Sequence, residues 1–284
     1  MTQRIDLHAH THCSDGSLRP AALVALAKEV GLSGLAVTDH DTTGGLDEAR
    51  AAGRSMGVDV WLGVEITARF PGRAMHLLAY GFDEREPGFV AMLEEIVRGR
   101  ELRNPRILDR LAALGVPVTM DEVRAEARGD VVGRPHIAQA MRRRGHVPDT
   151  KAAFTLYLRD GGPAFVPSDS VEPVEVVRRV RAAGGTTVIA HPKQLRLESV
   201  AKHEKVVDEL AAEGLGGIEV DHPSQKPEER DVFRRLAESR GLVSTGGSDF
   251  HGAAKPDIRL GTGDGTISVP RETYEALLAR CAAG

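Results

Sequence analysis

Short apolar runs in this chain repeatedly end in a histidine or a carboxylate, and an amphipathic segment follows most of them. Alternation of apolar, β-branched runs with amphipathic segments is typical of βα units around a largely parallel sheet. The runs predicted as strands cover residues 4–8, 34–40, 58–67, 74–82, 186–191, 216–222 and 242–251. In parallel barrels the C-terminal strand ends converge on one face, where active residues gather. The sequence therefore predicts an α/β chain folded as a distorted (β/α)7 TIM-like barrel.

Segment 87–160 departs from this alternation, because strand patterns disappear there and helical patterns continue. We expect a metal-binding barrel formed by residues 1–86 and 161–284, and a helical insertion subdomain over residues 87–160 that acts as a substrate-binding lid. The runs 58–67 and 74–82 are close enough to pair as a hairpin. The other predicted helices cover residues 20–31, 46–56, 174–183, 200–213, 228–240 and 271–283.

Composition limits the partners of such a barrel. The formal net charge is −4, and the aromatic residues among 284 are one Trp, three Tyr and seven Phe. A chain with neither a basic excess nor many aromatic residues is not expected to bind long duplex nucleic acid. Cys13 and Cys281 are too few and too far apart for a disulfide scaffold, and no apolar run fits a signal peptide or a membrane span. A cytoplasmic protein is expected.

The polar residues at the predicted strand ends form a metal-ligand pattern. His8 and His10 are two apart, so both side chains point the same way from an extended strand. Imidazole and carboxylate together suit manganese, iron or zinc better than calcium. The candidates exceed the roughly four to six ligands of one ion, so we expect a multinuclear cluster bridged by carboxylates such as Glu65. The predicted ligands are His8, His10, Asp15, His40, Glu65, His76, His191, Asp249 and His251.

Five motifs resemble, in order, those of the polymerase and histidinol phosphatase (PHP) superfamily of metal-dependent phosphoesterases: DLHAHTHCSDG, LAVTDHD, GVEIT, VIAHP and GGSDFH. The resemblance implies a seven-stranded barrel with three divalent ions per chain, manganese foremost and iron or zinc as alternatives. It implies one ion on His8, His10, Glu65 and Asp249, a second on Glu65, His76 and His191, and a third on Asp15, His40 and His251.

Such a cluster suits hydrolysis of a phosphate ester, because divalent ions lower the pKa of bound water and neutralise charge on the phosphate. The sequence contains no P-loop, no GxSxG elbow and no cysteine-based phosphate loop. We therefore expect direct attack on phosphorus by a metal-bridging hydroxide, without a phosphoenzyme.

Within the insert, the segment VGRPHIAQAMRRRG places Arg134 and His136 at a predicted helix start. A guanidinium and free helix amides suit a phosphate, and a surface capping segment is the alternative. The GRPHIA motif resembles the branch of the superfamily that acts on nucleotides. This implies a nucleotide substrate, with hydrolysis of the 3′-phosphate of nucleoside 3′,5′-bisphosphates to a nucleoside 5′-monophosphate and phosphate. Action on short RNA with a 5′-phosphate, as a 5′-to-3′ exoribonuclease, would follow from the same chemistry.

Further functional residues are expected near the predicted mouth of the barrel. His222 and Asp249 are the expected catalytic residues. His222 is a phosphate contact, a proton donor to the leaving 3′ oxygen or, equally, a loop histidine bonded to backbone. Lys193 is an expected phosphate contact. Asp6 and Asp39 are expected to accept hydrogen bonds from imidazoles of the ligand set.

Two other functions stay open from the sequence. One is a phosphatase of a small ester such as histidinol phosphate, although an insert of about seventy residues favours a larger substrate. The other is a non-catalytic metal-binding or proofreading module, although no polymerase domain is present and the ligand set is intact.

Overall fold

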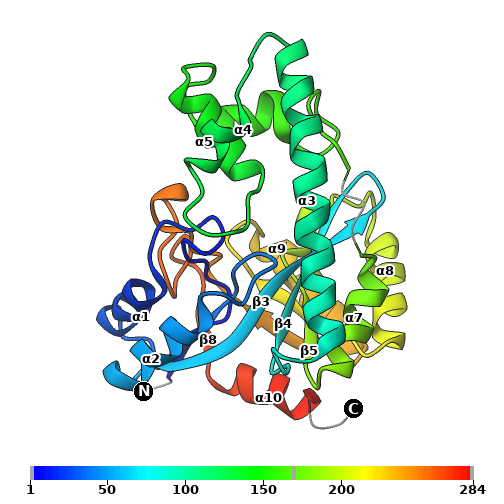
Figure 1. Ribbon diagram of the computed structural model, residues 1–284. Helices are drawn as coiled ribbons and strands as arrows, with labels where there is room; N and C mark the ends of the chain where they lie inside the picture. Colours follow the sequence, from blue (N-terminus) through cyan, green and yellow to red (C-terminus); the bar gives the residue numbers. More distant parts are fainter. Residues whose placement is uncertain (1–2, 168–170, 282–284) are drawn as a thin grey trace.

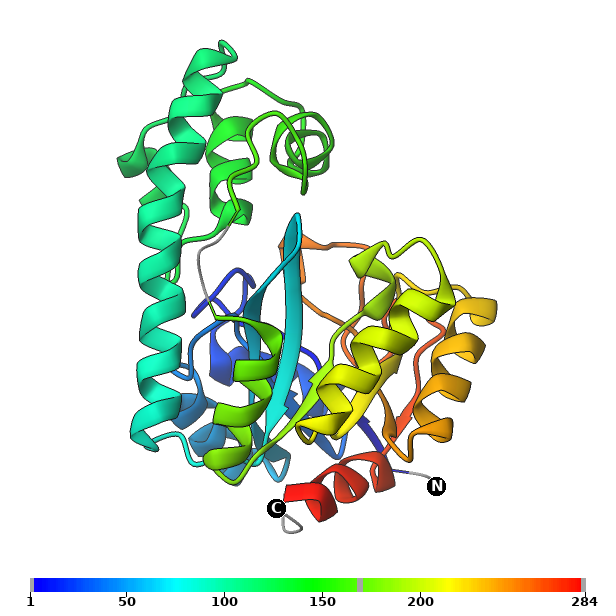
Figure 2. The same ribbon diagram turned by 90° about the vertical axis from the view of Figure 1, so that its right-hand side faces the viewer.

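The computed structural model describes residues 3–167 and 171–281, which form a barrel with a helical extension over one end (Figures 1 and 2). Eight strands form one sheet in the order β7-β6-β5-β4-β3-β2-β1-β8. A parallel bridge between Ala9 and Phe250 joins the chain beyond β1 to the chain beyond β7, which nearly closes the barrel. The strands are β1 (Arg4–Asp6), β2 (Gly34–Val37), β3 (Asp59–Phe70), β4 (Arg73–Tyr80), β5 (Thr186–Ile189), β6 (Gly217–Asp221), β7 (Val243–Gly246) and β8 (Val269–Pro270).

The predicted α/β barrel is confirmed, and its distortion comes from β4. This strand runs antiparallel to both β3 and β5, whereas β1–β2, β2–β3, β5–β6 and β6–β7 are parallel pairs. The predicted hairpin of β3 and β4 is therefore present. Strand β8 is an addition to the seven predicted strands. It has two residues and pairs antiparallel with β1, so it is too short to leave an alternating pattern in the sequence.

Six of the seven predicted strands end before the residues predicted to close them, β1 and β7 among them. Strand β1 ends at Asp6 rather than His8, and β7 ends at Gly246 rather than His251. Beyond these points the two segments pass very close to each other, since a Cβ added to Gly247 would lie 2.3 Å from the Cβ of His8. A glycine is therefore required there, and it lets both segments turn over the mouth of the barrel.

Helices follow most strands and occupy every predicted helical segment. Helix α2 has the predicted bounds, and α10 follows the predicted C-terminal helix up to Cys281, while residues 282–283 of that prediction lie outside the described residues. Over residues 3–167 and 171–281, none of the helices combines the length and the apolar character needed to cross a membrane. The barrel helices are α1 (Pro20–Glu29), α2 (Leu46–Met56), α7 (Pro173–Ala182), α8 (Val200–Ala212), α9 (Pro227–Ser239) and α10 (Glu272–Cys281).

The helical extension stands over the mouth of the barrel and is joined to it by the long helix α3 (Pro87–Ala113), which runs along the barrel and beyond it (Figure 2). The first half of α3 buries Phe89, Met92 and Ile96 in the barrel core, and the second half buries Ile107 and Leu111 in a separate core. That second core also includes Ala164 and Val166, beyond the predicted end of the insert. The other elements of the extension are α4 (Met120–Arg124), α5 (Arg134–Arg143), α6 (Thr150–Ala153) and the π-helical turn η1 (Phe154–Leu158).

Candidate metal centre and substrate cavity

The carboxylate of Glu65, on β3, lies at the centre of the barrel mouth and is buried, with 1% exposure. Five imidazole nitrogens lie 2.9 to 3.3 Å from its two oxygens: His8 Nε2, His10 Nε2, His40 Nδ1, His76 Nδ1 and His191 Nε2. Burial acts to raise the pKa of Glu65, but the surrounding imidazoles together hold it well below its usual value. Glu65 is therefore an anion shared by five side chains from four segments of the barrel: β4 and the chain just after β1, β2 and β5.

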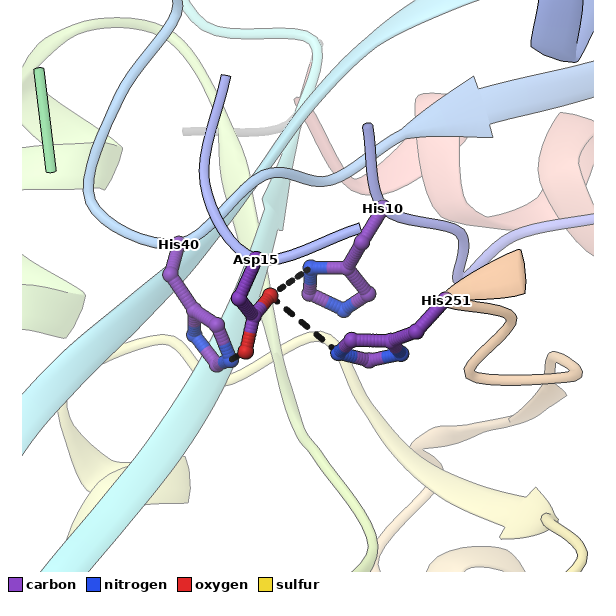
Figure 3. Close-up of side chains that lie close together, drawn as sticks. All are labelled: His10, Asp15, His40 and His251. Carbon is purple, nitrogen blue, oxygen red and sulfur yellow. Dashed lines mark ion pairs between the residues drawn. The ribbon is translucent and has the colours of Figure 1, made fainter. Parts of the chain in front are cut away.

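Asp15, on the first loop, lies among three imidazoles at one side of the mouth (Figure 3). Its Oδ1 is 3.2 Å from His251 Nε2 and 3.8 Å from His10 Nδ1, and its Oδ2 is 3.9 Å from His40 Nε2. His10 thus faces Asp15 with one ring nitrogen and Glu65 with the other. The groups around the two carboxylates form one continuous cluster.

Asp249 follows β7 in a left-handed backbone conformation, with φ of 53°. Its Oδ2 lies 2.6 Å from Lys255 Nζ, a partner that no sequence motif had indicated. Burial acts to raise the pKa of Asp249, but Lys255 and the nearby imidazoles hold it well below its usual value. Four imidazoles lie 3.3 to 3.6 Å from its oxygens: those of His8, His10, His222 and His251.

The cluster has the properties of a site for divalent cations. Both ring nitrogens of His10, Nδ1 of His40 and Nδ1 of His76 are buried; carboxylate oxygens lie near them, but none of the described residues makes a well-aligned hydrogen bond to them, an arrangement that costs free energy unless something binds them. Burial lowers the pKa of His40 to about 3, so its ring is neutral and has a lone pair to offer. Imidazole and carboxylate donors suit manganese, iron or zinc. The residues present therefore fit the metal ions that the sequence implied.

All nine predicted ligands lie in this cluster. His8, His10, Glu65 and Asp249 have ligand atoms within 4.8 Å of one another, as do the four side chains of the His10–Asp15–His40–His251 group. A third group joins His40, Glu65 and His76, and the ring of His191 reaches Glu65 at 2.9 Å. The three predicted sets are thus adjacent and overlapping, with Glu65 and His10 shared between groups.

Glu219, in the middle of β6, belongs to the cluster and was missed from the sequence. It is fully buried; its Oε1 lies 2.8 Å from His8 Nδ1, and its Oε2 accepts from the His191 N–H at 2.7 Å. By occupying Nδ1 of His8, Glu219 turns the other ring nitrogen of His8 toward Glu65 and Asp249. A glutamate inside the apolar run GGIEVDH was the signal, because a buried strand carries an acidic residue only when that residue is paired.

The expectation for Asp6 and Asp39 was wrong. Asp6 accepts from the backbone N–H groups of His8, Ser248 and Gly261 and from the Ser248 hydroxyl. Asp39 accepts from the Thr11 N–H, the Thr11 hydroxyl and the Ser14 hydroxyl. Both carboxylates hold the loops that carry the cluster rather than its imidazole rings, because the backbone amides freed at the strand ends need acceptors.

A cavity of about 200 Å³ separates this cluster from the insert. Asp15, His40 and His76 form part of its barrel side. The insert contributes Arg100, Arg103, Gly133, Arg134, Pro135, His136 and Phe154. Anionic and imidazole groups on one side therefore face guanidinium groups and the start of a helix on the other.

The predicted phosphate-binding residues Arg134 and His136 both line this cavity, at the start of α5. Arg134 donates to Asp160 Oδ1 at 2.7 Å and to the Leu158 carbonyl at 3.0 Å. The Nδ1 of His136 accepts from the Gly133 N–H at 3.1 Å. A phosphate contact by His136 stays a prediction, since Nδ1 already has a protein partner.

A buried ion pair joins the insert to the barrel beside the cluster. Arg100 on α3 donates from Nε to Asp41 Oδ2 at 2.8 Å and from Nη2 to the Thr67 hydroxyl at 2.8 Å. Asp41 directly follows His40 and accepts from the Thr67 N–H at 2.6 Å. Asp41 is 1% exposed and Arg100 is 8% exposed. No sequence pattern pointed to this pair, whose members are 59 positions apart.

His222 lies against the cluster, and Lys193 points elsewhere. His222 Nδ1 accepts from the Ser224 N–H at 3.0 Å, so the neutral ring carries its proton on Nε2, 3.3 Å from Asp249 Oδ2. Lys193 Nζ pairs with Glu229 Oε2 at 2.7 Å, and it is not among the described residues that line the cavity. Its predicted phosphate contact therefore has no support from this geometry and stays a prediction.

Comparison with known proteins agrees with the motifs. The PHP domain family matches residues 6–114. The chain is 36% identical to a 5′-3′ exoribonuclease of Haemophilus influenzae, over 88% of this chain and 91% of that protein. It is 32% identical to a 3′,5′-nucleoside bisphosphate phosphatase of Chromobacterium violaceum, over 97% of each chain. A solved structure from Bifidobacterium adolescentis, described as a metal-dependent phosphoesterase, superposes with a TM-score of 0.88 at 35% identity, covering 98% of this chain and 96% of that chain.

The resemblance inferred from the five motifs is thus confirmed over nearly the whole length of the chain. A buried cluster of imidazoles and carboxylates at the mouth of a distorted barrel, together with relatives above 30% identity, leads to one conclusion. The chain belongs to the PHP family of phosphoesterases, which hydrolyse phosphate esters.

Proposed function

We propose that this protein is a manganese-dependent phosphatase that removes the 3′-phosphate of nucleoside 3′,5′-bisphosphates. One observation carries the proposal: the cavity has a cation-binding cluster on its barrel side and arginines with a helix start on its insert side. A substrate with two phosphates on one nucleoside has an anion for each side. The printed activities of the two relatives described above support the same substrate class.

The nine clustered residues predicted from the sequence are the proposed ligands of three divalent ions. When bound, such ions lower the pKa of water and neutralise the charge that develops on a phosphate ester. Glu219 and Asp6 fix the positions of His8 and of the loop before Asp249, so the donor atoms are already arranged before an ion arrives.

On the insert side, Arg134 and the amides at the start of α5 are the proposed contacts of the 5′-phosphate. A guanidinium supplies paired donors, and a helix start adds partial positive charge. This contact would orient the nucleotide so that its 3′-phosphate meets the metal centre. Phe154 lines the same cavity and offers an apolar ring to the nucleoside.

His222 is the proposed proton donor to the leaving 3′ oxygen. In its protonated form the ring can give the Nε2 proton to the leaving oxygen and return to the neutral form, with the remaining proton on Nδ1 facing the Ser224 hydroxyl. In a His222→Ala variant we expect turnover to fall while the bound metal stays unchanged. A loop histidine without a catalytic role would leave the turnover unchanged as well.

Short RNA with a 5′-phosphate is a second proposed substrate. Its first nucleotide carries a 5′-phosphate and a 3′-phosphodiester, so it presents the same two anions to the cavity. The relative from Haemophilus influenzae, named a 5′-3′ exoribonuclease, favours this extension.

The test measures kcat/KM in manganese for adenosine 3′,5′-bisphosphate, 3′-AMP, 5′-AMP, histidinol phosphate and 5′-phosphorylated RNA. We expect the bisphosphate to exceed 3′-AMP by about 10- to 100-fold, since charge-assisted hydrogen bonds to the 5′-phosphate are lost in 3′-AMP. EDTA should abolish turnover, and manganese should restore it. Preference for histidinol phosphate, or equal rates with and without the 5′-phosphate, would refute the proposal.

Two variants on α5 test the role of Arg134. Arg134→Met should raise KM for the bisphosphate and leave 3′-AMP hydrolysis within about threefold of wild type. The matched control is Arg142→Met, on the exposed face of the same helix. This control should behave as wild type with both substrates.

A further inference from the structure

The insert side of the cavity holds three arginines, and their charges are balanced unequally. Arg100 pairs with Asp41, and Arg134 pairs with Asp160. Within residues 3–167 and 171–281, no carboxylate pairs with Arg103. The net positive charge on this side of the cavity is therefore centred on Arg103.

Arg103 is also buried, with 5% exposure, although it lines the cavity. Its Nη2 donates to the side-chain oxygen of Asn104 at 3.3 Å, and its buried Nε has no hydrogen-bond partner in the described part of the chain. Burial, followed by the neighbouring charges of Arg100 and Arg134, lowers the pKa of Arg103 to about 9, so the group is still a cation at neutral pH. A buried cation with an unused donor is costly to keep unless a ligand pairs with it.

The surroundings hold this guanidinium in place. Arg103 lies one helical turn after Arg100 on α3, so both point from the same face of that helix. Asn104 Nδ2 donates to the Val132 carbonyl at 2.9 Å, which ties this turn of α3 to the segment before α5. Arg103 on α3 and the start of α5 therefore line the cavity in fixed positions relative to each other. A guanidinium held in this way is suited to binding an anion at one defined place.

We infer that Arg103 is the principal anchor of the substrate's distal phosphate, with Arg134 and the start of α5 as supporting contacts. The substrate class rests on the proposed function, and the location of the anion site does not. A phosphate monoester fits best, because it can accept from Nε and a terminal nitrogen of one guanidinium together. A phosphate there would supply the counter-charge that Asp41 and Asp160 supply to the neighbouring arginines.

The first experiment needs neither metal nor turnover. Metal-free protein in EDTA is titrated calorimetrically with 5′-AMP and, as a reference without a phosphate, with adenosine. Arg103→Met should weaken 5′-AMP binding about 30- to 100-fold, and Arg103→Lys should recover part of this loss by restoring the charge. The control Arg98→Met, on an exposed position of the same helix, should bind as wild type does. Equal affinity of Arg103→Met and wild type would overturn the inference.

The second experiment separates binding from a structural role. In manganese, Arg103→Met should lower kcat/KM for adenosine 3′,5′-bisphosphate by a similar factor and change 3′-AMP hydrolysis less than about threefold. Its melting temperature should equal or exceed that of wild type, because a buried cation without a carboxylate partner has been removed. A lower melting temperature with equal losses on both substrates would mean that Arg103 is structural, and would refute the inference.

The two proposals fail in different ways. If wild type hydrolyses the bisphosphate and Arg103→Met does so equally well, the inference is wrong and the proposed function stands. If wild type shows no preference for the bisphosphate while Arg103→Met loses 5′-AMP binding, the proposed function is wrong and the anion site stands.

Discussion

The two sides of the cavity differ in how completely their charges are balanced within the protein. On the barrel side, Glu65, Asp15 and Asp249 are surrounded by imidazoles, and Glu219 and Asp6 hold the parts that carry those imidazoles. On the insert side, Arg100 and Arg134 have carboxylate partners, whereas Arg103 has none among the residues that the structure describes. The barrel side therefore presents fixed donors to cations, and the insert side presents one open position to an anion.

This difference, together with the proposed function, assigns reaction chemistry and substrate choice to separate elements. Under the proposed function, residues at the strand ends decide whether a phosphate ester can be hydrolysed, and residues on α3 and α5 decide which ester enters. Changes on the barrel side should reduce activity toward every substrate, whereas changes on the insert side should alter the ratio between substrates.

The largest effect is expected from Glu65→Gln. An amide cannot replace an anion that faces five imidazoles, so the variant should lose manganese and about 10³-fold or more of kcat on all substrates. Metal content by plasma mass spectrometry and steady-state kinetics measure the two losses. Glu101→Gln, on an exposed position of α3, is the control. Full metal content together with more than about a tenth of wild-type kcat in Glu65→Gln would contradict the role of Glu65 as a metal ligand required with every substrate.

Next in size is the ion pair that joins the two sides. Arg100→Met alone, or Asp41→Asn alone, should lower the free energy of unfolding by about 3–5 kcal/mol, because each leaves a buried charge without its partner. The double variant should be more stable than the sum of the two losses predicts. Urea denaturation of the wild type, the two single variants and the double variant gives the coupling free energy between Arg100 and Asp41. Strict additivity would show that Arg100 and Asp41 do not act as a pair.

A more exposed ion pair provides the control for this double-mutant experiment. Arg50 and Glu84 lie 3.0 Å apart at 24% side-chain exposure each. Arg50→Met should cost less than about 1 kcal/mol, since exposed pairs are screened by water.

A smaller effect on metal binding is expected from Glu219→Ala. Loss of the acceptor at His8 Nδ1 should weaken manganese affinity about 10- to 100-fold by freeing the ring to rotate. The preference for the bisphosphate over 3′-AMP should stay that of wild type, because Glu219 lies on the barrel side. Metal titration and the ratio of the two kcat/KM values provide the measurements. A changed ratio at saturating manganese would contradict the separation of roles.

The smallest effect is expected from Lys193→Met. Lys193 pairs with Glu229 at a site where both side chains are more than one third exposed, so kcat/KM should change less than about threefold. A selective rise in KM for the bisphosphate would instead revive the phosphate contact predicted for Lys193 from the sequence.

The sequence predicted those features that depend on local pattern. The alternation of apolar runs and amphipathic segments located the seven main strands, and helix α2 has the predicted bounds because its apolar face and its terminal glycine are both local signals. The histidines and carboxylates at the strand ends were predictable as a group, since parallel strands bring their ends together.

The missed features depend on contacts between distant segments. Glu219, Lys255 and the Arg100–Asp41 pair take their meaning from partners that lie far along the chain or beyond the end of a strand. Asp6 was misread because its acceptor capacity is filled by backbone amides of residues 248 and 261, which no local pattern brings near it. The balance of charges inside a cavity likewise depends on tertiary contacts. The lack of a carboxylate partner for Arg103 among the described residues could therefore not be predicted from the sequence.

Helix α3 belongs to both hydrophobic cores, with Phe89 in one and Ile107 in the other, and its backbone runs unbroken between them. The insert therefore cannot melt on its own without fraying a helix that the barrel core also needs. This shared helix couples the folding equilibria of the barrel and the insert. It also keeps the cavity-lining arginines of α3 at a fixed position relative to the strand ends for as long as the barrel is folded.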